Sequence, residues 1–123
     1  MTYKDKLIAL VGVSANKSKM GYKMFEDLLQ NGFNVKGVNP KNGVILGQRI
    51  YRNLSELEDK PDIAVVVVKP EITEKIIDDV NNAGIKKIWM QPGSESENAI
   101  KKALNYGMEV IHGKCFMSEN GIW

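Results

Sequence analysis

The chain has 123 residues, of which 43% are hydrophobic and 26% are charged, an ordinary composition for a globular protein with a hydrophobic core. Its 17 basic and 15 acidic side chains leave a net charge of +2, too balanced for the basic face of a nucleic-acid-binding protein. No apolar run approaches the ~20 residues that span a bilayer, and the N-terminus lacks a signal-peptide pattern. We therefore expect one cytoplasmic domain over residues 1–123, with neither nucleic acid nor a membrane as a partner.

Apolar runs predict five β-strands, at residues 7–11, 35–38, 63–68, 87–90 and 109–112. The third run, Ile-Ala-Val-Val-Val-Val, contains no polar residue, which is typical of a parallel strand with both faces buried. Apolar residues at helical spacing predict helices at residues 21–31, 72–83 and 95–106, and a short helix is expected near Ser55. Ser94, three residues before Glu97, is expected to cap the last helix.

This alternation predicts an α/β fold, a Rossmann-like doubly wound parallel five-stranded sheet with helices on both faces. Numbered along the chain, the strands are expected to lie in the order 3-2-1-4-5, with the topological switch between residues 7–11 and 87–90. Ligands of such sheets bind beyond the carboxyl ends of the strands. The functional residues are therefore expected at residues 12–21, 39–41, 69–70, 91–93 and 112–115.

The first strand runs into Gly12, a polar loop and a helix that begins at Gly21, an arrangement typical of phosphate sites in α/β sheets. Glycine lets the backbone approach a ligand, and the helix N-terminus offers free N–H groups to an anion. We expect Ser14 and nearby backbone N–H groups to hold a diphosphate, with positive charge from Lys17 or Lys19. The loop lacks the second glycine of a strict G-x-G-x-x-G motif, so a plain strand-to-helix turn stays an alternative.

The second strand ends in Asn39, Pro40 and Lys41. An NAD-binding site normally places an acidic residue here, which accepts hydrogen bonds from the ribose hydroxyls. Lys41 would instead attract a phosphate on the ribose, and both NADP and coenzyme A carry one. The alternative is a simple turn with a solvated lysine.

The next two strand ends are less specific. Pro70, after Lys69, suits the start of a helix, and with Val68 it would form an apolar wall for an adenine ring. Gln91 and Gly93 offer an amide and a flexible backbone that would line the path of a ligand's arm. A tight turn explains these two residues equally well.

His112 and Cys115 flank the end of the last strand. Nothing in the sequence orients them as a catalytic pair, and they are too few for a zinc site, so we assign no catalytic residue and no metal. An acyl-CoA-handling enzyme that uses His112 or Cys115 stays an alternative. The single cysteine leaves no partner for an internal disulfide, as expected in a reducing cytoplasm.

In this order, the segments resemble the small stand-alone CoA-binding proteins, whose domain is similar to the N-terminal CoA-binding domain of the succinyl-CoA synthetase alpha subunit. The segments that carry the resemblance are Val11-Gly-Val-Ser14 with Gly21-Tyr22, Val38-Asn-Pro-Lys41, residues 47–51 before Leu54, Val68-Lys-Pro70, Trp89-Met-Gln-Pro-Gly93 and Lys114-Cys115. No single motif is specific, but the ordered set is.

The resemblance implies a site for coenzyme A or an acyl-CoA. The residues implied are Gly12, Val13, Ser14, Gly21 and Tyr22 for the diphosphate, Lys41 for the phosphorylated ribose, Val68, Lys69 and Pro70 for the adenine side, and Gln91 and Gly93 for the pantetheine arm. The family commonly has two prolines where this chain has Lys69 and Pro70. The catalytic histidine of the synthetase lies outside this domain, so synthetase activity is not implied.

We therefore expect a non-catalytic CoA-binding or regulatory module, because the chain presents no complete catalytic constellation. An NADP- or NAD-binding redox sensor or small oxidoreductase is the main alternative, although hydride transfer requires a substrate-positioning half that five strands do not supply. Trp89 and Trp123 suggest packing against a partner, such as a second copy of the chain. The alternative for Trp123 is that it folds back on its own domain. The sequence does not identify a protein partner.

Overall fold

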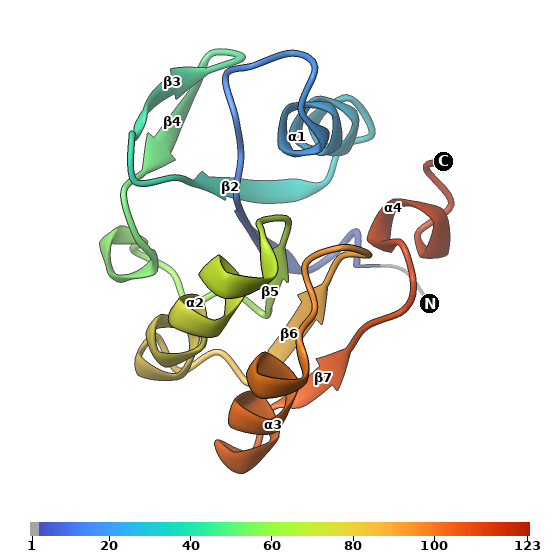
Figure 1. The fold of residues 1–123 in the computed structure, drawn as a ribbon. Helices are drawn as coiled ribbons and strands as arrows, with labels where there is room; N and C mark the ends of the chain where they lie inside the picture. Colours follow the sequence, from blue (N-terminus) through green and yellow to red (C-terminus); the bar gives the residue numbers. More distant parts are fainter. Residues whose placement is uncertain (1–2) are drawn as a thin grey trace.

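The computed structural model describes residues 3–123 and places seven strands in one sheet (Figure 1). The strands are β1 (Leu7–Val11), β2 (Asn34–Val38), β3 (Gly43–Ile45), β4 (Gln48–Tyr51), β5 (Ile63–Val66), β6 (Lys87–Met90) and β7 (Glu109–Ile111). The helices are α1 (Met20–Gln30), α2 (Pro70–Asn82), α3 (Glu97–Asn105) and α4 (Phe116–Glu119), with a short 3-10 helix, η1 (Leu54–Glu56), after β4. None of the helices in residues 3–123 combines the length and apolar composition that a membrane crossing requires.

The strand order is β3-β4-β2-β1-β5-β6-β7, and every neighbouring pair is parallel except β3 and β4. The predicted Rossmann-like α/β fold is confirmed, with seven strands in place of five. The predicted order of the strands is wrong, because β5 lies beside β1 and the position beyond β2 is taken by β4. The topological switch therefore lies between β1 and β5.

The sequence pattern does not predict strand β4, because only Ile50 of its four residues is buried and the strand forms no apolar run. It pairs with β2 at Gly37 and Val38. A Cβ at Gly37 would lie 2.8 Å from Ile50 Cδ1, so glycine leaves the space that the isoleucine fills. A tight turn at Leu46 and Gly47, both with positive φ, then pairs β3 with β4 and extends the sheet beside the end of β2.

The carboxyl ends of β1, β2 and β5 are aligned with one another, and this alignment determines how the loops at the candidate site lie. Val11 pairs with Val38 of β2 and with Val66 of β5. Gly12 N then donates to Val38 O at 3.0 Å, which continues the alignment one residue further. The loops that follow β1, β2 and β5 therefore leave the sheet side by side.

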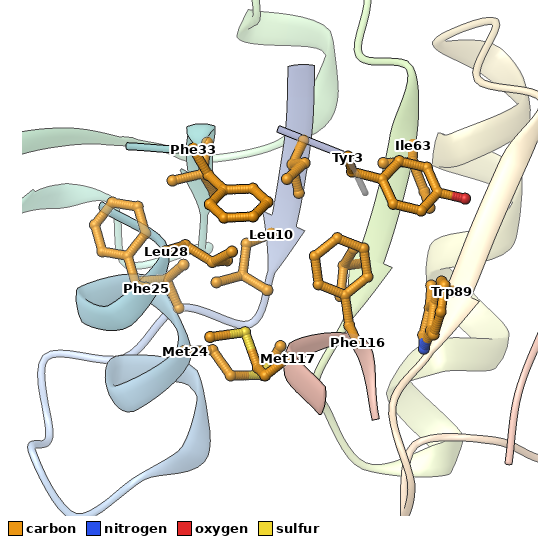
Figure 2. Close-up of a cluster of buried hydrophobic side chains, with 14 of the residues drawn as sticks. Tyr3, Leu10, Met24, Phe25, Leu28, Phe33, Ile63, Trp89, Phe116 and Met117 are labelled. Atoms are coloured by element: carbon orange, nitrogen blue, oxygen red, sulfur yellow. The ribbon is translucent and has the colours of Figure 1, made fainter. Parts of the chain in front are cut away.

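Two hydrophobic layers hold the helices on opposite faces of the sheet (Figure 1). On one face, α1 and α4 pack through Met24, Phe25, Leu28, Phe116 and Met117 (Figure 2). On the other face, α2 and α3 pack through Ile77, Val80, Ala99 and Ala103. Strand β5 contributes to both layers and all its residues are buried, which confirms the prediction from its unbroken apolar run.

An aromatic cluster anchors the C-terminal segment to β6. The rings of Trp89 and Phe116 meet edge to face with centroids 5.1 Å apart, and Tyr3 contacts both (Figure 2). Trp89 Nε1 also donates to Lys114 O at 2.9 Å. These contacts place residues 114–117 beside the carboxyl end of β6.

Candidate functional site

The loop between β1 and α1 folds back onto its own start. Gly12 has a φ of 111°, and a Cβ there would lie 2.5 Å from Val67 O. A Cβ at Gly21, in the first turn of α1, would lie 2.1 Å from Gly12 O. Both distances are too short for any side chain, so the two glycines let the N-terminus of α1 rest directly on the ends of β1 and β5.

The N-terminus of α1 is left open by the side chains around it. Lys19 is its N-cap residue, in an extended conformation and without a capping hydrogen bond, and the first turn contains no acidic residue. The first N–H groups of a helix have no partner within the helix and carry partial positive charge. This end of α1 is therefore suited to bind an anion.

Side chains inside the loop hold its shape. Ser14 Oγ accepts a hydrogen bond from Asn16 N at 3.0 Å, and Asn16 Oδ1 accepts one from Ser18 N at 3.0 Å. A hydroxyl that accepts can still donate its proton, so Ser14 keeps a donor for a ligand. Val13 is fully buried, and Tyr22 packs against the α1 side of the core, so these two side chains belong mainly to the packing beneath the loop.

Asn39 ties the end of β2 to this loop. Its Nδ2 donates to Val13 O at 2.6 Å, and its Oδ1 accepts from Lys41 N at 2.8 Å. Its backbone oxygen accepts from Asn42 N at 2.8 Å, which closes a turn. The turn holds Pro40 and Lys41 exposed beside the loop, while the side chain of Asn39 is engaged by the protein's own backbone.

The end of β5 leads directly into α2. Val68 and Pro70 are half-buried and Lys69 between them is exposed. Pro70 is the first residue of α2, where the missing N–H of proline has no helical partner to lose. The two apolar residues lie on the side of the switch point opposite to β2.

Ser94 joins the ends of β5 and β6. Its Oγ accepts from Val68 N at 3.1 Å, and the residue is only 3% exposed. The prediction that Ser94 caps the last helix is therefore wrong. Ser96 caps α3 by accepting from Ala99 N at 3.0 Å. Local sequence does not distinguish a cap from a serine that binds the amide of a neighbouring loop.

Gln91 is 3% exposed, and both atoms of its amide group are used within the protein. Its Oε1 accepts from Phe116 N at 2.6 Å, and its Nε2 donates to Cys115 Sγ at 3.5 Å. Gln91 thus fastens the C-terminal segment to the end of β6. Gly93 is exposed with a φ of 93°, and its N–H donates to Glu95 Oε1 at 2.9 Å.

Cys115 is half-buried beside Gln91. Burial acts to raise the pKa of its thiol, but hydrogen bonds with Gln91, Ser118 and the Met117 backbone outweigh burial and lower that pKa below its usual value. His112 is exposed, and within residues 3–123 no hydrogen bond joins it to Cys115. The same residues contain no group of three His, Cys, Asp or Glu side chains that could hold a metal ion.

The predicted site residues lie together at the carboxyl ends of β1, β2, β5 and β6, and they differ in exposure. Lys17, Lys19, Pro40, Lys41, Lys69 and Gly93 are exposed; Gly12, Ser14, Tyr22, Asn39, Val68 and Pro70 are half-buried; Val13, Gly21 and Gln91 are buried. Exposed and half-buried groups can contact a ligand, whereas the buried ones shape the loops.

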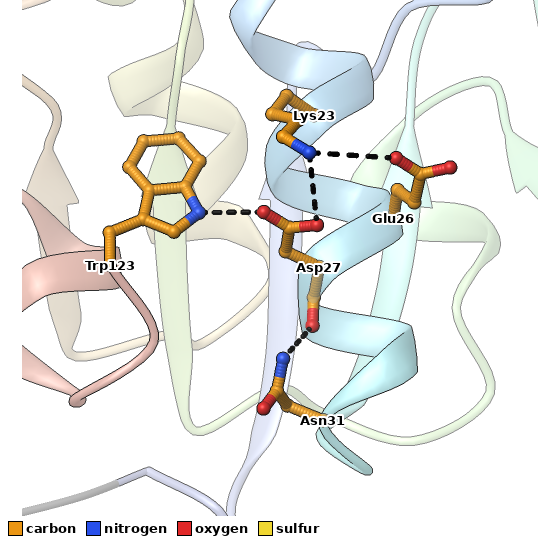
Figure 3. A network of polar contacts seen from close by, with 5 residues as sticks. All are labelled: Lys23, Glu26, Asp27, Asn31 and Trp123. Atoms are coloured by element: carbon orange, nitrogen blue, oxygen red, sulfur yellow. Dashed lines mark hydrogen bonds and ion pairs between the residues drawn. The ribbon is translucent and has the colours of Figure 1, made fainter.

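The exposed lysines give this edge a positive charge. In the described part of the chain, Lys17, Lys19, Lys41 and Lys69 form no ion pair with an acidic side chain. Lys23, one turn into α1, is different: its Nζ lies 3.5 Å from Asp27 and 3.9 Å from Glu26 (Figure 3). The four loop lysines thus have no acidic partner in the described residues, whereas the lysine on α1 has two.

A hollow of about 520 Å³ lies elsewhere in residues 3–123. It is formed by residues 53–61 and the last turn of α2, at the amino end of β5. Glu58, Asp59 and Asp79 line it and would repel a phosphate, with Lys60 as its one basic residue. This hollow is therefore poorly suited to an anionic ligand, whereas the uncapped start of α1 and the exposed lysines lie at the opposite edge of the sheet.

Known proteins contain closely similar domains. The chain is 29% identical over 118 residues to an ADP-forming acetate–CoA ligase of Methanocaldococcus jannaschii, which covers 89% of this chain but 17% of the ligase. A solved conserved hypothetical protein of Pyrococcus furiosus has a TM-score of 0.89 at 40% identity, covering 93% of this chain and 98% of that one. A dinucleotide-forming acetyl-coenzyme A synthetase of Candidatus Korarchaeum cryptofilum has a TM-score of 0.76 at 32% identity, covering 88% of this chain and 26% of the synthetase.

The chain therefore spans a small part of the ligase and synthetase chains that it matches, but nearly all of one solved protein. The resemblance drawn from the ordered motifs is confirmed by a family model, that of the CoA binding domain, which matches residues 6–121. This chain belongs to the CoA binding domain family.

Proposed function

We propose that this protein binds coenzyme A, or an acyl-CoA, at the carboxyl ends of β1, β2, β5 and β6. The observation that carries the proposal is the open N-terminus of α1, which has no cap and no acidic residue in its first turn, with exposed lysines around it. Coenzyme A carries a diphosphate and a 3′-phosphate, the anions that such an edge binds. Membership of the CoA binding domain family supports the same ligand.

The diphosphate would lie at the start of α1. There it would accept hydrogen bonds from backbone N–H groups and from Ser14, with Lys17 or Lys19 supplying charge. The fit depends on the two glycines, because the close approach of Gly21 to Gly12 O brings the helix start onto the sheet. A ligand at the switch point then meets the helix end directly.

The rest of the ligand would extend over the neighbouring loops. Lys41 would bind the 3′-phosphate, and Val68 and Pro70 would contact the adenine. The pantetheine arm would pass Gly93, which is exposed, whereas the buried amide of Gln91 would act indirectly by holding the C-terminal segment.

We propose a binding or regulatory role and not a catalytic one. Within residues 3–123, no hydrogen bond joins His112 to Cys115, so these two residues are not arranged as a nucleophile and its base. The ligase reaction is not carried over from the relatives, because the match covers 17% of the ligase.

Thermal denaturation with CoA, acetyl-CoA, dephospho-CoA, NADP and NAD tests the ligand. A ligand that binds the native state raises the midpoint of unfolding, so CoA is expected to raise it and NAD is not. Protection by NADP without protection by CoA would overturn the proposal in favour of a redox sensor or small oxidoreductase.

Replacing Lys41 by alanine tests where the 3′-phosphate binds. Lys41→Ala is expected to weaken CoA about tenfold, the worth of one exposed charge-assisted contact, and to leave dephospho-CoA unchanged. Titration calorimetry measures both affinities, and Lys101→Ala, an exposed lysine on α3, is the control. Equal losses for the two ligands would contradict the role of Lys41.

One observation favours a second candidate, an acyl-CoA-handling enzyme. The lowered pKa of the Cys115 thiol increases the fraction of reactive thiolate. This candidate predicts that the wild-type protein consumes acetyl-CoA and that Cys115→Ser does not, with thioester loss as the measurement. If the wild-type protein does not consume acetyl-CoA, this candidate fails and only the binding role remains.

A further inference from the structure

Asn39 forms four hydrogen bonds that connect three parts of the molecule. Its backbone N–H donates to Tyr51 O at 2.8 Å, and its backbone oxygen accepts from Asn42 N at 2.8 Å. Its side chain donates to Val13 O at 2.6 Å and accepts from Lys41 N at 2.8 Å. This residue thereby joins β4, the turn after β2 and the loop between β1 and α1.

The two side-chain bonds link the two places where phosphates are proposed to bind. Val13 precedes Ser14 in the loop at the start of α1, and its side chain is fully buried, so its carbonyl has a well-defined position. Lys41 is exposed, and within residues 3–123 no acidic side chain pairs with its ammonium group. The backbone position of Lys41 therefore sets the region beside the loop that its flexible side chain can reach.

An acidic residue could not replace Asn39 in this arrangement. A carboxylate would still accept from Lys41 N, but it would face Val13 O with no hydrogen to donate. NAD-binding sites use Asp or Glu at the end of the second strand to bind the ribose hydroxyls. The inward hydrogen bond of Asn39 to Val13 O is thus incompatible with that way of binding a ribose.

We propose that Asn39 is a positioning residue that sets the preference of the site for a 3′-phosphorylated nucleotide. It acts through Lys41, by holding the lysine's turn at a set distance from the loop that receives the diphosphate. The ligand can then bind both groups at once without reordering the turn. This inference rests on the proposed binding of CoA.

A double-mutant cycle tests the inference. The dissociation constants of CoA and dephospho-CoA are measured by calorimetry for the wild type, Asn39→Ala, Lys41→Ala and the double variant, and their ratio gives the preference for the 3′-phosphate. Asn39→Ala is expected to lower this preference several-fold, up to the about tenfold expected for Lys41→Ala. When Lys41 is already alanine, the further change of Asn39 is expected to leave the preference unchanged.

Asn53→Ala is the matched control. Asn53 Oδ1 accepts from Ser55 N at 3.1 Å, a local bond like that between Asn39 and Lys41, but at the start of η1. It is expected to leave the preference unchanged. Should Asn39→Ala fail to fold by circular dichroism, Asn39→Ser serves in its place, because serine offers an acceptor to Lys41 N but is too short to reach Val13 O.

Three results would overturn the inference. If Asn39→Ala, or Asn39→Ser, weakens CoA and dephospho-CoA equally, the residue is merely structural and the proposed function stands. If Asn39→Ala changes the preference as much in the Lys41→Ala protein as in the wild type, Asn39 does not act through Lys41. If the wild type binds neither ligand, the proposed function fails, and this inference fails with it.

Discussion

Helices α1 and α3 both follow strands of the same sheet, yet only the N-terminus of α3 is capped by a side chain. The start of α3 is closed by the protein itself, since Ser96 Oγ accepts from Ala99 N and Glu97 lies in the first turn. The start of α1 has neither a cap nor an acidic residue. A helix end that the protein satisfies needs no ligand, whereas one that it leaves open beside exposed lysines is ready for an anion.

The largest effect is expected at the contact that seats the open helix end on the sheet. Gly21→Ala would place a Cβ 2.1 Å from Gly12 O, so we expect it to lower the free energy of unfolding by about 3 kcal/mol. Urea denaturation measures the change. Gly113→Ala is the control, because its φ of 78° strains alanine but nothing lies within 4 Å, and it is expected to cost about 1 kcal/mol. Similar costs at both positions would contradict the importance of the close contact.

The second-largest effect on stability is expected from adding a side-chain cap to the N-terminus of α1, like the cap of α3. Lys19→Asp places a carboxylate at the N-cap position, so we expect the free energy of unfolding to rise by about 1 kcal/mol. The same carboxylate would occupy the free N–H groups and repel the diphosphate, so CoA affinity is expected to fall by about tenfold or more.

Thermal denaturation without ligand and calorimetry with CoA measure these two opposite changes. Lys19→Ala is the control, because it removes the charge without adding a cap. A more stable Lys19→Asp protein that binds CoA as tightly as Lys19→Ala would show that the diphosphate does not use the start of α1.

The smallest effect is expected from opening the start of α3. Ser96→Ala removes the cap and the hydrogen bond from Ser96 Oγ to Glu74 Oε2, so the free energy of unfolding is expected to fall by about 1 kcal/mol. CoA affinity is expected to stay unchanged, because no lysine-rich loop surrounds this helix end. Ser96→Thr keeps an oxygen acceptor and should recover most of the stability. A loss of CoA affinity in Ser96→Ala would remove the distinction between the two helix ends.

Beyond its first turn, α1 does have hydrogen-bond partners within the chain. Asp27 accepts a hydrogen bond from Trp123 Nε1 at 2.6 Å, and its backbone oxygen accepts one from Asn31 Nδ2 at 2.7 Å (Figure 3). The C-terminal residue therefore packs on α1 of the same chain, one of the two possibilities for Trp123, and these contacts leave the open end free.

Much of the site could be predicted because it depends on local sequence. The change from an apolar strand to Gly12, a basic loop and Gly21 identified the helix end that the structure shows to be open. The unbroken apolar run of residues 63–68 identified a strand buried on both faces. Parallel strands bring their carboxyl ends to one edge, so the sequence could predict that the candidate residues lie together without knowledge of the strand order.

Other features could not be predicted because they depend on neighbours far along the chain. Ser94 satisfies the sequence rule for a helix cap better than Ser96. Its hydroxyl instead accepts a hydrogen bond from Val68 N, 26 residues away. Strand β4 has too few apolar residues to be recognised and forms only where Gly37 makes room for Ile50.

The amino-acid sequence by itself determined the fold class, the two-faced burial of the sheet and the chemistry gathered at its carboxyl edge, because these follow from periodicity and from residue types at strand ends. Only the tertiary structure decided the strand order and the partners of Asn39, Gln91 and Ser94. The physical reason is that a polar side chain binds whichever donor or acceptor the fold places within about 3 Å, and that partner is set by the packing of distant segments.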